Sequence, residues 1–407
     1  MAPLSDRSRS FPIGHDFYQP KEEMLEIERR RKQLSIGIPR EDGKGENRIC
    51  LTPQSVEVLV CNGHDVMLER GAGLASNYSD EEYSENGAQI IDSKATIYQC
   101  DVVMQVSPFS NAEIDMLRGN QVLISALQIK SQSDDNIRKL MQKKVTAIAL
   151  ELVKDENNFF PVVRSMSEIA GISAVMIAGE YLSKAHGGKG VMLGGITGIT
   201  PAEVIVLGAG TAAEYATRAA MGLGAMVKVF DDSIYRLRRL EDHLAHRVFT
   251  SIFHPHVLEK ALASADVVIG ALRYEKNITG FIVTENMVSK MKPGSIIIDL
   301  SIDQGGCFET SMMTTHKDPV FKKFGVLHYC VPNVPSHVSR TASLALSNIC
   351  SPLLLKIGND GGVHQFIKRN LGLRHGTYIY RGILTNRRLG DSFGILAKDI
   401  DLLLAAM

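Results

Sequence analysis

The sequence lacks the features that mark several specialised classes of protein. It has no excess of charge, because 45 Lys and Arg side chains balance 45 Asp and Glu side chains, so no overall field steers it to nucleic acid or to an anionic membrane. Its six cysteines are scattered without a CxxC spacing, which argues against a zinc site and against a secreted disulfide framework. We therefore expect no metal, no nucleic-acid partner and a reducing compartment.

Long apolar runs are also missing. No stretch approaches the roughly 20 residues that a membrane span requires. The first residues, MAPLSDRSRS, lack the apolar centre of a signal peptide. We expect a cytoplasmic protein without a membrane partner. A chain of 407 residues is long enough for two domains.

The most informative segment is VIVLGAGTAAEYATRAAMGLGAMVKVFDDS, over residues 204–233. An apolar strand leads into Gly208, which makes a tight turn, and Gly210 lets a pyrophosphate approach the backbone where the next helix starts. Ala213 takes the third small-residue position of this fingerprint. Asp231 ends a second strand about 20 residues later, where a carboxylate binds the adenosine ribose and repels a 2′-phosphate. The segment predicts a dinucleotide site that prefers NAD over NADP.

Short apolar strands alternate with helices along most of the chain. This rhythm predicts an α/β protein with two Rossmann-like units, each with a parallel, doubly wound sheet. Strands are expected over 34–39, 101–106, 121–127, 146–151, 204–207, 227–230, 266–270, 295–300 and 325–331, and a capping box is expected at Ser79 and Glu82.

Two long helices are predicted to join the units across a cleft, over residues 167–185 and 340–356. Ligands of open parallel sheets bind beyond the carboxyl ends of the strands, so this cleft is the expected site. The predicted division is an N-terminal extension with a charged helix (1–33), a discontinuous substrate domain (34–161 plus 340–407) and an NAD-binding domain (162–339).

Several segments together resemble alanine dehydrogenase, of the alanine dehydrogenase and NAD(P) transhydrogenase alpha-subunit family. They are GIPREDGKGENRICLTP, ERGAGLASNYSDEEY, SMSEIAG, HGGKGVMLGGITG, GAGTAA, MKPGSIIIDLSIDQGGCFETS and HYCVPNVPSHVSRTAS, and the similarity covers nearly all of residues 34–395. The resemblance implies a homo-oligomer, usually a hexamer, that interconverts L-alanine and pyruvate plus ammonia with NAD.

The resemblance also assigns roles to residues. Arg48 matches the arginine that holds the substrate carboxylate, a role suited to a planar guanidinium, although a surface charge is the alternative. Asp303 matches the aspartate beside the nicotinamide and the substrate, and Gly305 and Gly306 after it would leave room for the cofactor. Other matched positions contact cofactor or substrate: Ser167, Asp231, Val331 and Asn333. Ser167 has the alternative role of capping its long helix.

Two positions depart from the family. Ser107 stands where the family has a lysine that contacts the substrate, and Gln128 stands where it has the histidine that serves as acid and base. Glutamine has no titratable proton near neutrality. Proton transfer by a positioned side chain contributes about 10² to 10⁴ in rate. The two replacements therefore predict altered activity on L-alanine.

Three functions follow from this pattern. The first is an alanine dehydrogenase with a rearranged proton path through Lys130, although a solvated loop lysine is the simpler description of that residue. The second is a dehydrogenase of the same fold for another amino or imino acid. The third is a catalytically silent NAD-binding subunit that regulates or joins an active paralogue. The intact Arg48, Asp303 and NAD motif argue against the third. The remaining histidines, among them His337, are expected in loops.

Overall fold

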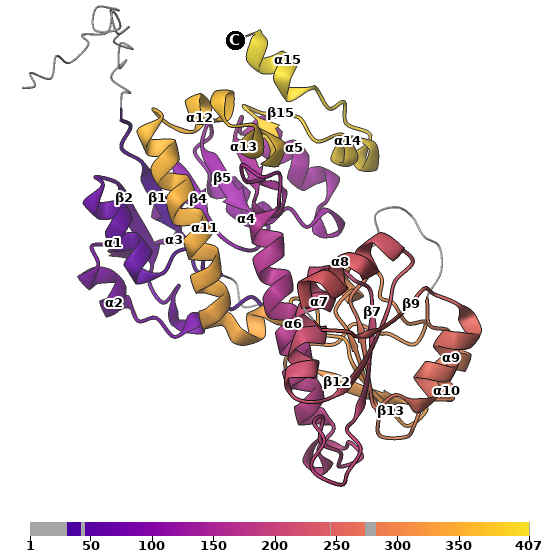
Figure 1. The fold of residues 1–407 in the computed structure, drawn as a ribbon. Coiled ribbons are helices and arrows are strands. Elements are labelled where there is room, and N and C mark those ends of the chain that lie inside the picture. Colours follow the sequence, from indigo (N-terminus) through magenta and orange to yellow (C-terminus); the bar gives the residue numbers. More distant parts are fainter. Residues whose placement is uncertain (1–30, 42–44, 245, 273–281, 407) are drawn as a thin grey trace, which may run out of the picture.

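The computed structural model describes residues 31–41, 45–244, 246–272 and 282–406. Two α/β domains are visible in it, each built on a largely parallel sheet (Figure 1). The predicted fold class is therefore confirmed. The predicted charged helix lies outside the described residues except for 31–33, which form no helix.

The first sheet has eight strands in the order β15-β14-β6-β5-β4-β1-β2-β3. Strands β1 to β6 run parallel, whereas β14 is antiparallel to β6 and β15 is antiparallel to β14. The C-terminal segment thus returns to the first domain and extends its sheet. The strands are β1 (Ser35–Ile38), β2 (Asp65–Glu69), β3 (Gln89–Ile91), β4 (Val102–Met104), β5 (Val122–Ser125), β6 (Thr146–Ala149), β14 (Thr377–Tyr380) and β15 (Ile383–Leu384).

The second sheet has seven strands in the order β12-β13-β11-β10-β7-β8-β9. Only β12 runs antiparallel among these described strands, beside β13 at one edge. The strands are β7 (Glu203–Leu207), β8 (Met226–Phe230), β9 (Phe249–Ser251), β10 (Val267–Gly270), β11 (Ile296–Asp299), β12 (Val320–Lys323) and β13 (Val326–Tyr329).

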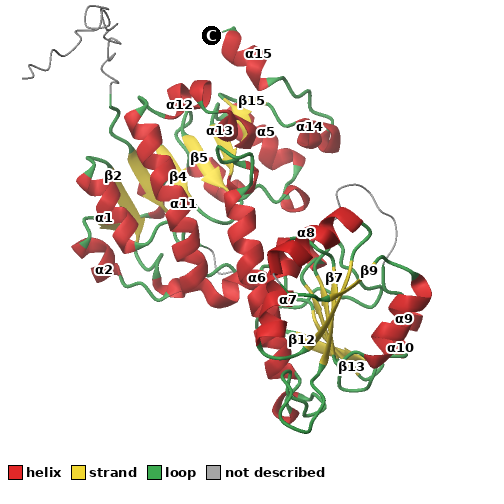
Figure 2. Ribbon diagram, viewed as in Figure 1, coloured by secondary structure: helices red, strands yellow, loops and turns green. Residues whose placement is uncertain are grey.

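Helices lie against both faces of each sheet (Figure 2). In β7, Val204 and Val206 pack into the core on one face while Ile205 and Leu207 pack into the core on the other. Strands buried on both faces read as continuous apolar runs, which is why the sequence revealed them. The capping box predicted at Ser79 is also present.

The helices of the first domain are α1 (Pro53–Cys61), α2 (Asp80–Glu85), α3 (Lys94–Ile97), α4 (Asn111–Met116), α5 (Asp134–Gln142), α12 (Val363–Arg369), α13 (Leu371–Gly376), α14 (Arg387–Phe393) and α15 (Ile400–Ala405). Those of the second domain are α7 (Thr211–Gly222), α8 (Ile234–Leu244), α9 (Pro255–Ser264) and α10 (Glu285–Ser289).

Two long helices, α6 (Pro161–Tyr181) and α11 (Ser339–Asn359), pack against each other where the domains join (Figure 1). Helix α6 begins earlier than predicted, because Pro161 occupies its first turn. Ser167 therefore lies inside the helix, and the alternative that it caps the helix is wrong.

These connecting helices also correct the expectation that no apolar segment is long enough for a membrane span. By length and composition alone, two helical segments are long and apolar enough to cross a membrane, Pro161–Tyr181 and Val334–Asn359. In the folded chain, however, Ala174 and Ala178 of α6 and Leu346 and Leu354 of α11 are buried in the domain cores. Core helices commonly have this composition.

Candidate active site at the domain junction

The glycine turn after β7 has the geometry that a pyrophosphate site needs. Gly208 has a φ of 111°, and a Cβ there would stand 2.7 Å from the backbone oxygen of Ala271. Gly210 caps α7, and a Cβ on it would meet nothing within 4 Å. Ala213 is buried in the first turn of this helix. The helix N-terminus is thus open to an anionic group, so these residues fit a dinucleotide.

Asp231 directly follows β8, and its carboxylate is almost fully buried. One oxygen accepts a hydrogen bond from the Ala209 amide at 2.8 Å. The other accepts from the Ser233 amide at 2.8 Å and from Arg236 Nε at 2.9 Å. Asp231 therefore holds the glycine turn in place. Arg236, which the sequence analysis did not include, is shared between Asp231 and Asp232, so the two carboxylates outnumber the one cation beside this turn.

Arg48 is a buried residue, so the alternative of a surface charge is wrong. Its Nε and Nη2 donate to the two carboxylate oxygens of Glu46 at 2.7 and 2.6 Å, and the two side chains are 9% and 7% exposed. This bidentate pairing fixes the plane of the guanidinium. The remaining nitrogen, Nη1, faces only the Met166 sulfur at 3.2 Å, a weak acceptor. Nη1 is therefore the atom of Arg48 with most capacity to bind a substrate carboxylate.

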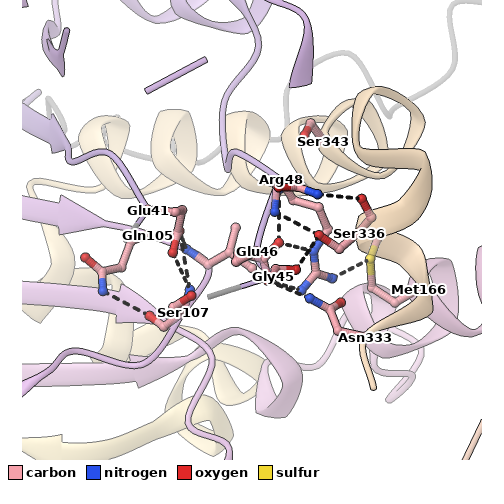
Figure 3. Close-up of polar contacts among 12 residues, drawn as sticks. Glu41, Gly45, Glu46, Arg48, Gln105, Ser107, Met166, Asn333, Ser336 and Ser343 are labelled. Carbon is pink, nitrogen blue, oxygen red and sulfur yellow. Dashed lines mark hydrogen bonds and ion pairs between the residues drawn. The ribbon is translucent and has the colours of Figure 1, made fainter. Parts of the chain in front are cut away.

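Asn333 connects this pair to the second domain (Figure 3). Its Nδ2 donates to Glu46 at 2.9 Å, and its backbone is left-handed, with a φ of 59°. Ser336 adds two more bonds, accepting from the Asn47 amide at 2.8 Å and donating to the Gly45 oxygen at 2.9 Å. The loop that carries Arg48 is thus fixed against the segment that follows β13.

Val331 lies between β13 and Asn333 and is buried. It therefore belongs to the carboxyl end of the second sheet, as its predicted role beside the cofactor requires. Ser167 lies on α6, partly exposed, directly after the Met166 residue that contacts Arg48. Neither position has a contact that assigns it to cofactor or substrate by itself.

Four residues follow neighbouring strands of the first sheet at its carboxyl edge. Glu41 follows β1, Ser107 follows β4, Gln128 follows β5 and Glu151 follows β6. Glu41 accepts from the Val106 amide at 2.5 Å and from the Ser107 amide at 3.2 Å. The two replaced positions therefore lie near each other, and carboxylates that the sequence reading missed hold their backbones.

Glu151 repeats this arrangement one strand further along. It accepts from the Leu127 amide at 2.9 Å and from the Gln128 amide at 3.1 Å. Gln128 is exposed and left-handed, with a φ of 42°, and leads into a short turn over Ile129–Ser131. Its side chain makes no capping hydrogen bond to this turn.

Burial raises the pKa of the Glu41 carboxyl to about 7, and the charge of Glu46 adds to this effect. Hydrogen bonds from the Ser107 side chain and from the backbone at Val106 and Ser107 act in the opposite direction. Glu41 thus changes its charge in the neutral range.

Asp303 lies in a turn over Ile302–Gln304 after β11 and is exposed. The Nζ atom of Lys130 donates to its backbone oxygen at 3.2 Å. Lys130 is exposed, as expected of a loop lysine, but it reaches from the first domain to the second. This contact places Lys130 and Asp303 together at the junction.

Asp299, at the end of β11, organises the loop that carries Asp303. Its oxygens accept from the amides of Ser301 and Cys307 at 3.0 and 2.9 Å, and burial raises the pKa of its carboxyl. A Cβ on Gly306 would stand 2.7 Å from the Asp299 carboxylate, so Gly306 lets this loop close. The expectation that Gly306 leaves room for cofactor is therefore wrong, whereas a Cβ on Gly305 would meet nothing within 4 Å.

Two histidines lie beside the Arg48 loop. The rings of His316 and His337 are stacked, with centroids 6.1 Å apart and planes at 12°. A Cβ on Gly45 would stand 3.6 Å from the His316 ring. Burial and the nearby His337 lower the pKa of His316, and the charge of Glu46 opposes this shift. His337 was expected in a loop near the site, whereas His316 had given no sequence signal.

These observations define a class of protein. An open glycine turn in one domain and a buried arginine in the other, close to the carboxyl ends of two parallel sheets, are the parts of a two-domain, dinucleotide-dependent oxidoreductase. No group of metal-binding side chains occurs among the residues that the structure describes.

Comparison with known proteins gives the family. The models of the alanine dehydrogenase/PNT N-terminal and C-terminal domains match residues 37–170 and 174–387. Alanine dehydrogenase 2 of Staphylococcus aureus is 37% identical over 369 residues, which cover 90% of this chain and 99% of that protein. The chain therefore belongs to the alanine dehydrogenase/PNT family, whose members use a nicotinamide cofactor, and is an enzyme of the amino-acid dehydrogenase type.

Solved structures agree with this assignment. An L-alanine dehydrogenase superposes with a TM-score of 0.83 at 34% identity, covering 89% of this chain and all of that one. A transhydrogenase from Sinorhizobium meliloti superposes with a TM-score of 0.73 at 24% identity, covering 87% of this chain and all of that one, and shares the fold.

Replacing Arg48 by alanine should weaken pyruvate binding by about 2 to 5 kcal/mol, because a buried charge-assisted contact to the carboxylate is lost. Affinity for NAD should change little, since Arg48 lies in the other domain. Calorimetric titration of both ligands measures the two effects, with circular dichroism to confirm that the variant folds around the unpaired Glu46. Equal weakening of NAD binding would show that Arg48 is structural.

Proposed function

We propose that the protein is an NAD-dependent L-alanine dehydrogenase, converting L-alanine, NAD and water to pyruvate, ammonia and NADH. Ser107 and Gln128 replace the lysine and histidine of the family. The observation that carries the proposal is the contact of Asn333 with Glu46, because it brings the carboxylate-binding Arg48 to the end of the nucleotide-binding sheet.

Each site residue has one task in this proposal. Arg48 holds the substrate carboxylate through Nη1, and Asp303 stabilises charge near the amine with Lys130 beside it. NAD, when bound, accepts the hydride from the substrate Cα. The residues proposed to hold or contact it are Ser167, Gly208, Gly210, Ala213, Asp231, Val331 and Asn333.

Purified protein incubated with NAD and L-alanine should form NADH, which absorbance measures. A panel of other amino acids in the same assay tests the second candidate, a different amino-acid substrate. That candidate is favoured by Ser107, whose short side chain leaves Glu41 without the lysine of the family. NAD binding without turnover of any member of the panel would instead indicate a silent regulatory subunit.

The site should bind NAD more tightly than NADP, and Asp231→Ser should narrow the gap by roughly tenfold, or about 1.4 kcal/mol. The change removes a negative charge and frees Arg236 Nε, while Arg236 Nη2 keeps its pair with Asp232, so that the guanidinium has a donor for a 2′-phosphate. The double variant Asp231→Ser with Arg236→Ala is the matched control and should lose the gain. Fluorescence titration with both reduced cofactors measures the affinities, and equal affinities in the wild type would remove Asp231 from this role.

L-Alanine turnover by the wild type should be slow, and Ser107→Lys combined with Gln128→His should raise it at least about tenfold. A lysine at position 107 would find the Glu41 carboxylate beside it, and histidine tolerates the left-handed backbone at position 128 better than most residues. The two changes act on one transition state, so each single variant should recover little. Wild-type turnover near the ordinary value of about 10 s⁻¹ would contradict this prediction.

We also propose a cytoplasmic homohexamer. All six cysteines are free, which suits a reducing compartment. Large apolar side chains are exposed on α6, on the segment after it and at the end of α7. The backbone of Leu223, at the end of α7, lies close to Gly194 in the segment after α6. The exposed residues are Ile172, Met176, Met192, Ile196, Ile199 and Leu223. Such patches mark interfaces more often than free surface.

The variant Met176→Glu with Ile199→Glu should shift the protein from a hexamer to smaller species, because it places two charges in the apolar patch. Leu371→Glu is the control, since Leu371 is equally exposed but lies on α13 in the first domain. Sedimentation velocity measures the species present. A monomeric wild type, or no change in the patch variant, would exclude this interface.

A further inference from the structure

The reaction proposed above needs a group that accepts a proton from the substrate amine, and position 128 no longer supplies one. An amino acid binds as an ammonium ion, and its nitrogen has no free electron pair until one N–H bond breaks. Gln128 has no titratable proton, and its side chain makes no capping hydrogen bond to the turn that follows it. Another titratable side chain near Ser107 and Arg48 therefore has to accept the proton.

Glu41 meets the geometric requirements. Its carboxylate contacts the backbone of Ser107, the residue at the family's substrate-contacting position. Figure 3 shows this contact beside the cluster of Glu46, Arg48 and Asn333. Glu41 also lies at the carboxyl edge of the parallel sheet, where ligands of such folds bind.

The replacement at position 107 leaves this carboxylate without a neighbouring cation from that position. A serine side chain ends several atoms short of a lysine ammonium and brings no charge, and the Ser107 hydroxyl hydrogen-bonds Glu41 instead. In the described part of the chain, Glu41 makes no ion pair, and its partners are Ser107 and the Val106 amide. An ammonium group of the substrate supplies the cation that the protein no longer provides.

We propose that Glu41 is the proton acceptor for the substrate amine, an inference that rests on the proposed function. The Glu41 carboxylate takes one proton from the α-ammonium group: an N–H bond breaks, an O–H bond forms on Glu41, and the electron pair stays on nitrogen. The proton then has to pass from Glu41 to solvent before the next turnover.

The charged groups around Glu41 are consistent with this task. On its own side lie Glu46, which Arg48 neutralises, and the buried thiol of Cys50, whose pKa is raised mainly by burial. On the side of β4, Gln105 donates to the Ser107 oxygen at 3.1 Å. Behind Gln105, Glu113 pairs with Lys94 at 3.1 Å. No described cation competes with a substrate ammonium for Glu41.

The pH dependence follows from the charge state. The pKa of Glu41 is raised to about 7, so the carboxyl is protonated below that pH and ionised above it. A proton acceptor has to be ionised, so kcat/KM for L-alanine should rise through about pH 7. Glu41→Gln should abolish this rise in kcat/KM near pH 7, which is the acidic limb of the pH profile, and lower kcat at least about tenfold. The affinity for pyruvate, which depends on Arg48, should change much less. Glu41→Asp should keep a pH-dependent acidic limb.

Glu151→Gln is the matched comparison, because Glu151 also binds strand-end amides but follows β6, three strands away from β1. It should retain the limb near pH 7. A limb that persists in Glu41→Gln, or that disappears instead in His316→Gln, would assign the proton to another group and overturn the inference.

A binding measurement separates this inference from the proposed function. An ammonium ion beside Glu41 favours its ionised form, so L-alanine binding at pH 7 should release protons from the wild type and not from Glu41→Gln. Calorimetry in buffers of different ionisation enthalpy detects the release. Release without any NADH formation would keep Glu41 at the amine and overturn the proposed function. NADH formation without proton release would keep the proposed function and overturn the role of Glu41. Absence of L-alanine binding would overturn both the proposed function and the role of Glu41.

Discussion

The buried ion pair of Arg48 and Glu46 is the interaction on which the site depends. Two charges can be buried in this way only as a well-matched pair, because an unpaired buried charge costs several kcal/mol. The pair lies in the first domain, but Asn333 of the second domain completes it. The same hydrogen bonds therefore stabilise the charges and fix where the carboxyl edges of the two sheets lie.

Other features of the junction follow from this arrangement. Ser336 holds the backbone of the Arg48 loop, and Lys130 reaches the oxygen of Asp303 from the opposite domain. Asp299 keeps the Asp303 loop closed through buried hydrogen bonds. The substrate side and the cofactor side are thus assembled by polar contacts between segments that lie far apart in the sequence, while the apolar cores only support them.

What could be read from the sequence was local. The nucleotide-binding motif could be predicted because a strand, a turn and a helix follow one another within one short segment, which contains Gly208, Gly210 and Asp231. Buried parallel strands were found because both faces are apolar, but β14 and β15 are antiparallel additions without a helical partner to signal them. The start of α6 was misplaced because Pro161 reads as a helix breaker as easily as a first-turn residue.

The partners of the site residues were beyond such reasoning. The sequence did not show that Glu46 folds back onto Arg48 within one loop. That Glu41 and Glu151 hold the turns of Ser107 and Gln128 depends on strand order in the folded sheet, which the order of residues does not give. The resemblance indicated Ser107 and Gln128 as replaced positions, and the fold then showed the carboxylates of Glu41 and Glu151 beside their backbones.

The central claim is that hydride moves from the Cα atom of an amino acid held by the first domain to a nicotinamide held by the second. The most direct measurement uses L-alanine deuterated at Cα, with mass spectrometry of the reduced cofactor after incubation with the purified protein and NAD. We expect reduced cofactor one mass unit heavier than with ordinary L-alanine, even if turnover is slow. Unlabelled reduced cofactor, or none despite bound NAD and L-alanine, would contradict the account.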